Sequence, residues 1–236
     1  MKSEKWGKDD LSSFIDSAQH NELATFDNNK KAYQTLKDVD GIYHGMSESL
    51  ANTKSLIPSL LLLRSHSAYR GASRLTLSGQ IPESFVLARS CLEYALYALH
   101  IEKNEKLSDI WMNRHKDSDG LKACRKSFKH INVMETLKSV SAKEHDVVQK
   151  LYERTIDFGG HPNELAVTSS LKIRHDPEKI NFEQFYLVGD SLQLDHGIKS
   201  VSQIGLASLF VLRFIWKQRF DMAGYTAKMD TLKSKL

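Results

Sequence analysis

Cysteine is scarce in this chain of 236 residues, which contains only Cys91 and Cys124. Two cysteines offer neither a disulfide framework nor a zinc-ligand cluster. Cys91 falls in the most apolar stretch of the sequence, where a thiol behaves as a small hydrophobic side chain. A reduced, cytoplasmic setting is therefore the expectation.

Long apolar runs are absent as well. No stretch of the sequence reaches the roughly 18 apolar residues that a membrane-spanning helix needs. The charged N-terminal residues Met1 to Trp6 are not followed by the apolar segment of a secretory signal. We therefore expect neither a membrane span nor a signal peptide.

Motifs that bind phosphate groups or metals are also missing. The sequence contains neither the Gly-x-x-x-x-Gly-Lys-Ser/Thr pattern of P-loop proteins nor Gly-x-Gly-x-x-Gly, and it has no Glu-x-x-His pair. These absences exclude P-loop, dinucleotide-binding and di-iron bundle functions, and we expect no metal and no cofactor. The formal net charge is +4, from 33 Lys and Arg against 29 Asp and Glu. That balance permits a nucleic-acid partner without arguing for one.

Helical periodicity is what the sequence has in abundance. Only 4 prolines and 12 glycines interrupt it, and the stretches between them repeat apolar residues at helical spacing. Pro58 and Pro82 stand where helices begin, because a first-turn residue needs no N–H donor. The helix from Pro82 to about Glu102 is apolar on nearly all sides, which places it at the centre of a bundle. The other expected helices cover 58–77, 107–114, 120–129, 133–140, 143–158 and 190–220.

Three segments differ from this helical pattern. Residues 1–55 are polar with scattered apolar positions, and we interpret them as an amphipathic helical arm packed loosely on a bundle of residues 56–236. After His161, β-branched and aromatic residues become frequent around a turn at 175–178, which predicts a small β-hairpin or an irregular insertion. Residues 229–236 are polar and are expected to fray. The predicted fold class is an all-α helical bundle with this small insertion after residue 161.

Charged residues occur in the two helices that should be most buried. Arg89 and Glu93 lie four residues apart on one helix face and can pair, and Arg70 and Arg74 have the same spacing in the preceding helix. A charge inside a bundle is unfavourable unless it is paired or lines a cavity. One interpretation is a salt-bridge network that fixes how these two central helices dock on each other. The other is a pocket for an anionic group, with Arg89, Glu93 and Arg70 as substrate-binding residues.

The segment from Tyr152 to Asn163 carries the most suggestive pattern, YERTIDFGGHPN. On a regular helix, Arg154 and His161 are seven residues apart and fall within roughly 20° of each other around the axis. Gly159-Gly160 often ends a helix. His161 is then either a functional group held in a strained turn or part of a helix C-cap that satisfies the last carbonyls.

The arginine and histidine near the end of this helix, with the Arg-Ser-x-x-Glu pattern from Arg89 to Glu93, resemble the HEPN superfamily (higher eukaryotes and prokaryotes nucleotide-binding domains). The resemblance covers about residues 58–220. Many members are metal-independent RNA endonucleases with an Arg-x(4–6)-His motif. In this sequence Thr155 replaces the Asn, Asp or His that usually follows the arginine, and the double glycine within the motif is unusual.

The resemblance implies a reaction and a set of partners. An RNA 2′-hydroxyl would attack the adjacent phosphorus, with His161 moving the proton, Arg154 stabilising the phosphoryl oxygens and Asp157 orienting the imidazole. Arg89 or Glu93 would complete the pocket. A homodimer is implied, as is a toxin or antiviral defence role with an antitoxin or regulatory protein as partner. The alternative is a catalytically silent module of the same fold that binds a nucleotide, RNA or a protein.

Overall fold

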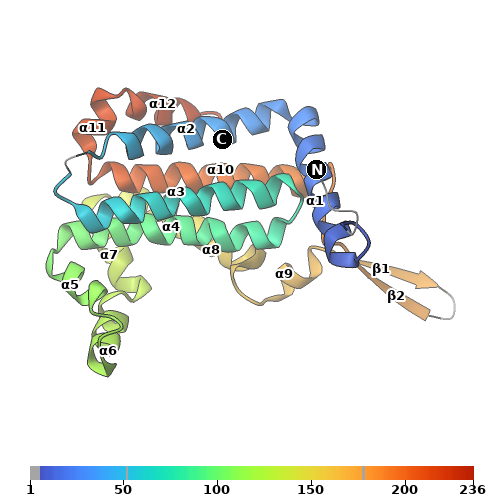
Figure 1. The fold of residues 1–236 in the computed structure, drawn as a ribbon, viewed down its shortest axis with the longest axis horizontal. Coiled ribbons are helices and arrows are strands. Elements are labelled where there is room, and N and C mark those ends of the chain that lie inside the picture. The colour runs from blue at the N-terminus through green and yellow to red at the C-terminus, as the bar shows by residue number, and fades with distance from the viewer. Residues whose placement is uncertain (1–5, 52, 177–178) are drawn as a thin grey trace.

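The computed structural model describes residues 6–51, 53–176 and 179–236, which form a helical bundle with one small β-hairpin (Figure 1). This architecture confirms the predicted fold class. The helices are α1 (Asp10–Asn28), α2 (Lys30–Glu48), α3 (Leu56–Leu77), α4 (Ile81–Lys103), α5 (Lys106–Met112), α6 (Ser118–Ser127), α7 (His130–Val140), α8 (Ala142–Thr155), α9 (Glu164–Thr168), α10 (Leu192–Arg213), α11 (Lys217–Met222) and α12 (Tyr225–Lys233), with a π-helical turn η1 (Ile156–Gly160) between α8 and α9.

Helix α4 is the central element of the bundle, as its apolar sequence predicts. It contacts α3, α10, α7 and α8, so neighbouring helices cover it on several sides and bury about half of its residues, most of them apolar. Phe85, Leu92 and Leu96 are among its fully buried side chains. A helix whose whole circumference is apolar is stable in water only when neighbours cover all of it.

Helix α2 is an integral part of the core, although we expected residues 1–55 to pack loosely. Apolar side chains recur along it at intervals of three and four residues and are only 0–3% exposed. These residues are Leu36, Val39, Ile42, Tyr43 and Met46. These side chains join one continuous core with α3, α4 and α10. The polar opposite face of α2 concealed this role, because it lowers the mean hydropathy of the segment.

Helix α10 approaches its neighbours closely because small residues face them. A Cβ at Gly205 would collide with the ring of Tyr69 and would lie 3.0 Å from Val39 Cγ1. The carbonyl oxygen of Gly205 also accepts a hydrogen bond from the Tyr43 hydroxyl at 3.3 Å. Cys91 lies beside this tyrosine at 3.4 Å, and burial raises the pKa of its thiol. Cys91 is thus a buried core residue, as its apolar context predicts.

The C-terminal region departs from the prediction in two ways. The helix expected over 190–220 ends at Arg213 and the chain turns into α11 and α12. Residues 229–233, expected to fray, belong to α12, where Met229 and Leu232, three residues apart, are 0% and 4% exposed. A short helix gains most of its stability from packing of this kind.

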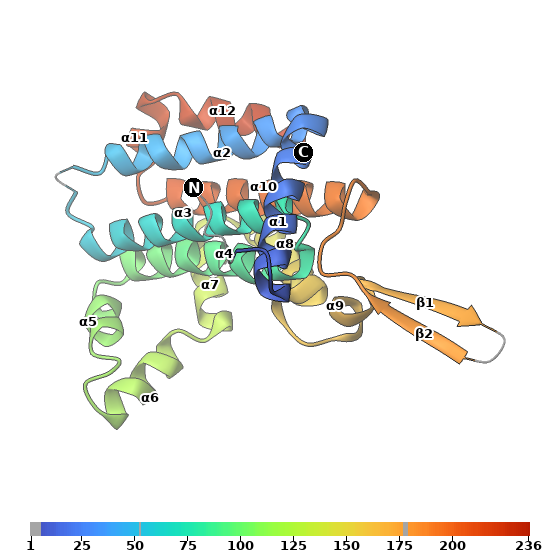
Figure 2. The ribbon, with the colours of Figure 1, turned by 45° about the vertical axis from the view of Figure 1, so that its right-hand side comes forward.

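The predicted insertion is an antiparallel hairpin of β1 (Leu171–Asp176) and β2 (Lys179–Gln184) that projects from the bundle beside α9 (Figure 2). Ile173 pairs with Phe182, and both are exposed. The opposite face of the hairpin carries an ion pair of 3.1 Å between Arg174 and Glu183. Residues 177 and 178 of the predicted turn lie outside the described residues. None of the described helices combines the length and hydropathy that crossing a membrane requires.

Candidate functional site

The helix that carries Arg154 does not continue to His161. Helix α8 ends at Thr155 and the chain widens into the π-helical turn η1, in which Gly159 has a φ of 151°. This turn lies against the start of α4, so a Cβ at Gly159 would collide with the carbonyl of Pro82. His161 follows in extended conformation, with φ −149° and ψ 145°. The seven-residue alignment of Arg154 with His161 therefore does not apply, because it requires a regular helix.

Asp157 and His161 are both exposed. In the described part of the chain, no hydrogen bond or ion pair joins either side chain to Arg154. The last turn is instead capped by Asn163, whose Nδ2 donates to the carbonyl of Ile156 at 2.7 Å. The Oδ1 of Asn163 then accepts from Ala166 N–H at 2.9 Å and begins α9. One of the two interpretations of His161 gave it this capping role, and Asn163 was missed, although Asn is a preferred helix N-cap.

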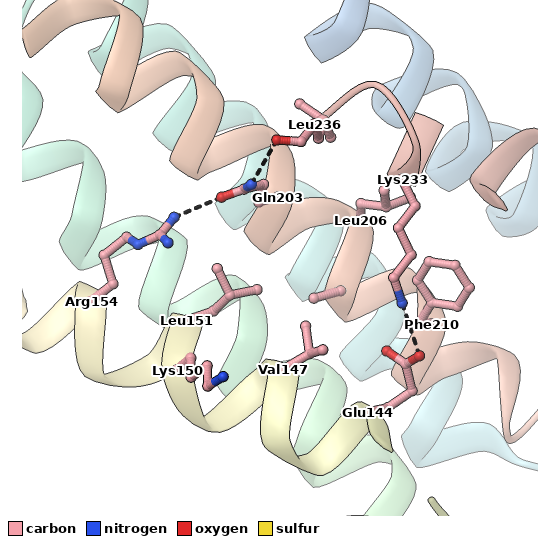
Figure 3. Close-up of a pocket in the computed structure, with 11 residues that line it drawn as sticks. Glu144, Val147, Lys150, Leu151, Arg154, Gln203, Leu206, Phe210, Lys233 and Leu236 are labelled. Atoms are coloured by element: carbon pink, nitrogen blue, oxygen red, sulfur yellow. Dashed lines mark hydrogen bonds and ion pairs between the residues drawn. The ribbon is translucent and has the colours of Figure 1, made fainter. Parts of the chain in front are cut away.

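Arg154 extends from α8 toward α10 (Figure 3). Its Nη1 donates to Gln203 Oε1 at 2.6 Å and to Ser200 Oγ at 3.3 Å. Gln203 Nε2 in turn donates to the main-chain oxygen of Leu236 at 3.1 Å. Both partners of the guanidinium are neutral, and within the described ranges it forms no ion pair.

Arg154 borders a groove of about 250 Å³ between α8, α10 and α12, which we call the α8–α10 groove. The opposite end of the groove holds an ion pair of 3.0 Å between Glu144 Oε1 and Lys233 Nζ. Lys150 adds a third cation on the exposed side. Between the two ends the lining is apolar and consists of Val147, Leu151, Leu206, Ala207, Phe210 and Leu236. The arrangement fits an elongated molecule with an acidic group at the Arg154 end.

Arg89 and Glu93 form a second polar cluster on the other side of α8. Arg89 Nε donates to Glu93 Oε1 at 2.9 Å, which confirms the pairing that their spacing predicts. Arg89 Nη2 also donates to the Tyr152 hydroxyl at 2.6 Å, and this hydroxyl donates to Glu93 Oε1 at 3.1 Å. Burial and the adjacent Glu93 raise the pKa of Tyr152 to about 12. The His130 ring stacks on Tyr152 with 4.0 Å between centroids, and burial lowers the pKa of His130.

The expectation that Arg89 or Glu93 completes a pocket with Arg154 is wrong. Tyr152 and Arg154 are two residues apart, which on a helix separates their directions by about 160°. Tyr152 therefore faces α4, whereas Arg154 faces α10. Neither Tyr152 nor His130 was singled out from the sequence, because their contact with Arg89 joins segments far apart in the chain.

Arg70 is separate from both groups. Its Nε and Nη2 donate to the two carboxylate oxygens of Asp40 on α2, at 2.7 and 3.0 Å. His66 Nε2 lies 2.7 Å from the same carboxylate. Burial acts against ionisation of Asp40, but the hydrogen bonds from His66 and Arg70 hold its pKa well below the ordinary value. Arg74 pairs with Glu22 of α1 at 2.9 Å. Arg70 and Arg74 thus dock α2 and α1 onto α3, so their role is structural, but they do not join the two central helices α3 and α4 as the salt-bridge interpretation expected.

Metal ligands do not gather anywhere in the part of the chain that the structure describes, where no three His, Cys, Asp or Glu side chains surround a common point. No family model, curated protein or solved structure matches this chain. The candidate site is thus defined by its own geometry: the α8–α10 groove with Arg154 at one end.

Proposed function

We propose that the protein is a binding module that holds the acidic group of a small ligand at Arg154 in the α8–α10 groove. The observation that carries this proposal is a partly buried guanidinium whose hydrogen-bond partners, Gln203 and Ser200, are both neutral. A cation at the edge of an apolar groove is stabilised most by an anion. Both bonds leave from Nη1, so among the described residues Nε and Nη2 remain for a two-point contact with a carboxylate or phosphate.

The positive potential around Arg154 supports the same function. The pKa of His196 on α10 is lowered mainly by burial and further by the positive charges of Arg154 and Lys199. Lys150 lines the groove beside Arg154. An anionic ligand therefore approaches a locally cationic surface, although the net charge of the chain is only +4.

Calorimetric titration tests this proposal, with decanoate and decanol as a charged and an uncharged probe and adenosine monophosphate as a nucleotide probe. We expect decanoate to bind more tightly than decanol, and Arg154→Met to abolish the difference. The matched control is Arg125→Met, which removes an exposed arginine of α6. Equal binding of decanoate by the wild type and by Arg154→Met would refute the proposal. If the protein binds adenosine monophosphate and neither decanoate nor decanol, the proposed function changes to that of a nucleotide-binding module.

A second candidate function is the metal-independent ribonuclease that the HEPN resemblance implies, with Arg154, Asp157 and His161 as catalytic residues. The exposure of Asp157 and His161, shortly after Arg154 in the chain, favours it, because an RNA strand can reach both side chains. A homodimer and a regulatory partner protein belong to this candidate. RNA cleavage in excess chelator tests it, comparing the wild type with Arg154→Ala and His161→Ala. This candidate is supported if the wild type alone releases products that end in a 2′,3′-cyclic phosphate. If the wild type cleaves none of a varied set of RNAs, the binding module remains as the proposed function.

A further inference from the structure

Glu144 is a buried carboxylate turned toward the α8–α10 groove. It is only 8% exposed and occupies the third position of α8, after the N-cap Ser141. A glutamate there usually bonds back to the N–H of the cap residue. In this protein the Ser141 N–H donates to the Leu137 carbonyl at 2.8 Å, so the carboxylate of Glu144 is not used for capping and lies in the groove instead.

Among the described residues, only one of the two carboxylate oxygens of Glu144 has a partner. Oε1 accepts from Lys233 Nζ at 3.0 Å, and this ammonium is held over the Phe210 ring at 4.6 Å. Oε2 is buried and has no hydrogen-bond partner among the described residues. A buried charged acceptor without a donor is unfavourable. A ligand that brings a donor to Oε2 removes that cost, whereas an apolar ligand end leaves it in place.

The two polar ends of the groove set the dimensions of the ligand. Glu144 and Arg154 are ten residues apart on one helix, so their backbones are about 15 Å apart along its axis. Val147 and Leu151 of α8 lie between them, facing Leu206 of α10. A molecule that reaches both ends therefore has an apolar body with a polar group at each end.

We infer that the ligand of this groove is an elongated aliphatic acid whose far end carries a hydrogen-bond donor, such as a hydroxyl or an amine. The acid binds at Arg154, the chain lies on the apolar lining, and the donor reaches Glu144 Oε2. This inference rests on the proposed function and specifies the class of molecule that the binding module takes.

Affinities of ω-hydroxydecanoate and decanoate, measured by calorimetric titration, test the inference. A hydrogen bond to a charged acceptor corresponds to roughly a tenfold or larger difference in affinity, so we expect the wild type to prefer the hydroxy acid by about that factor. Glu144→Met keeps the length of the side chain and removes both acceptors. We expect it to bind the two acids equally, while Glu135→Met on the exposed face of α7 keeps the preference.

The possible results separate the two proposals. If the wild type binds both acids equally and Arg154→Met abolishes the preference for decanoate over decanol, the groove takes an acid but Glu144 recognises no donor. If the preference persists in Glu144→Met, another group recognises the hydroxyl and the inference is wrong. If neither acid binds, the proposed function fails and the inference with it. The preference of the wild type is informative by itself if Glu144→Met does not fold.

Discussion

Tyr152 and Arg154 are two residues apart on α8, and their side chains bond to different helices on opposite sides of it. The Tyr152 hydroxyl joins Arg89 and Glu93 of α4, whereas the Arg154 guanidinium bonds to Gln203 of α10. One face of the helix thus holds the bundle together through a closed polar cluster. The other face presents a cation to a groove. This division separates residues that stabilise the fold from residues available to a ligand.

The closed cluster predicts a stability cost for Tyr152→Phe. Removing the hydroxyl deletes the hydrogen bond that it accepts from Arg89 and the one that it donates to Glu93, both in partly buried surroundings, so we expect the free energy of unfolding to fall by about 1–3 kcal/mol. Urea denaturation of the purified protein measures this. Tyr186→Phe removes a hydroxyl from a side chain that is 70% exposed and is the control. Equal stabilities of the two variants would contradict the structural role of the cluster.

The π-helical turn predicts that Gly159→Ala is destabilising. At φ 151° a side chain is strained, and a Cβ would also collide with the Pro82 carbonyl. We expect a loss of about 1–3 kcal/mol in unfolding free energy, measured by denaturation. Gly189→Ala is the matched control because its Cβ meets nothing within 4 Å. If alanine is tolerated at 159 as well as at 189, the turn does not pack against α4 as described.

The close packing of α10 predicts opposite effects for two glycines inside helices. Gly205→Ala places a Cβ against the Tyr69 ring, and overpacking of this kind costs about 1–3 kcal/mol. Gly41→Ala on α2 adds a Cβ in open space and should stabilise the helix by about 0.5–1 kcal/mol, since alanine loses less conformational entropy than glycine. Thermal unfolding should show a lower Tm for the first variant and a higher Tm for the second. A stabilising Gly205→Ala would disprove this packing.

His100 predicts a loss of stability in mild acid. Burial lowers its pKa in the folded protein, where Nδ1 lies 2.7 Å from Thr136 Oγ1. Between the lowered folded pKa and the unfolded pKa of about 6.5, the unfolded chain binds the proton more readily. The contribution of neutral His100 to the free energy of unfolding is therefore complete above a pH of about 6.5 and decreases as the pH falls below that value.

Denaturation of the wild type and His100→Gln at pH 7 and pH 5 measures this contribution. We expect the decrease in unfolding free energy between the two pH values to be smaller in the variant. The decrease does not vanish, because burial lowers the pKa of His130 and His196 too. His20→Gln, at an exposed position of α1, should retain the full decrease. An unchanged decrease in His100→Gln would show that this histidine does not contribute.

Much of the fold could be predicted from local sequence. Pro58 and Pro82 mark the first turns of α3 and α4, and the uniform apolarity of α4 predicts its central place. The i,i+4 spacing of Arg89 and Glu93 predicts their ion pair. The burial of α2 and the docking of α12 were missed, because each helix has a narrow apolar stripe whose partner lies far away in the chain.

The sequence by itself determined where most of the long helices form, that the helical run of α8 and η1 ends at the double glycine, and which charges pair within one helix. These features depend on periodicity and on backbone freedom over a few residues. Only the tertiary structure decided that Arg154 faces α10 while Tyr152 faces α4, and that Glu144 lies at the far end of the same groove as Arg154. The sequence places these side chains on one helix but carries no local signal of what lies opposite them. Packing of the whole bundle sets that relationship, because it fixes which neighbour covers each face of α8.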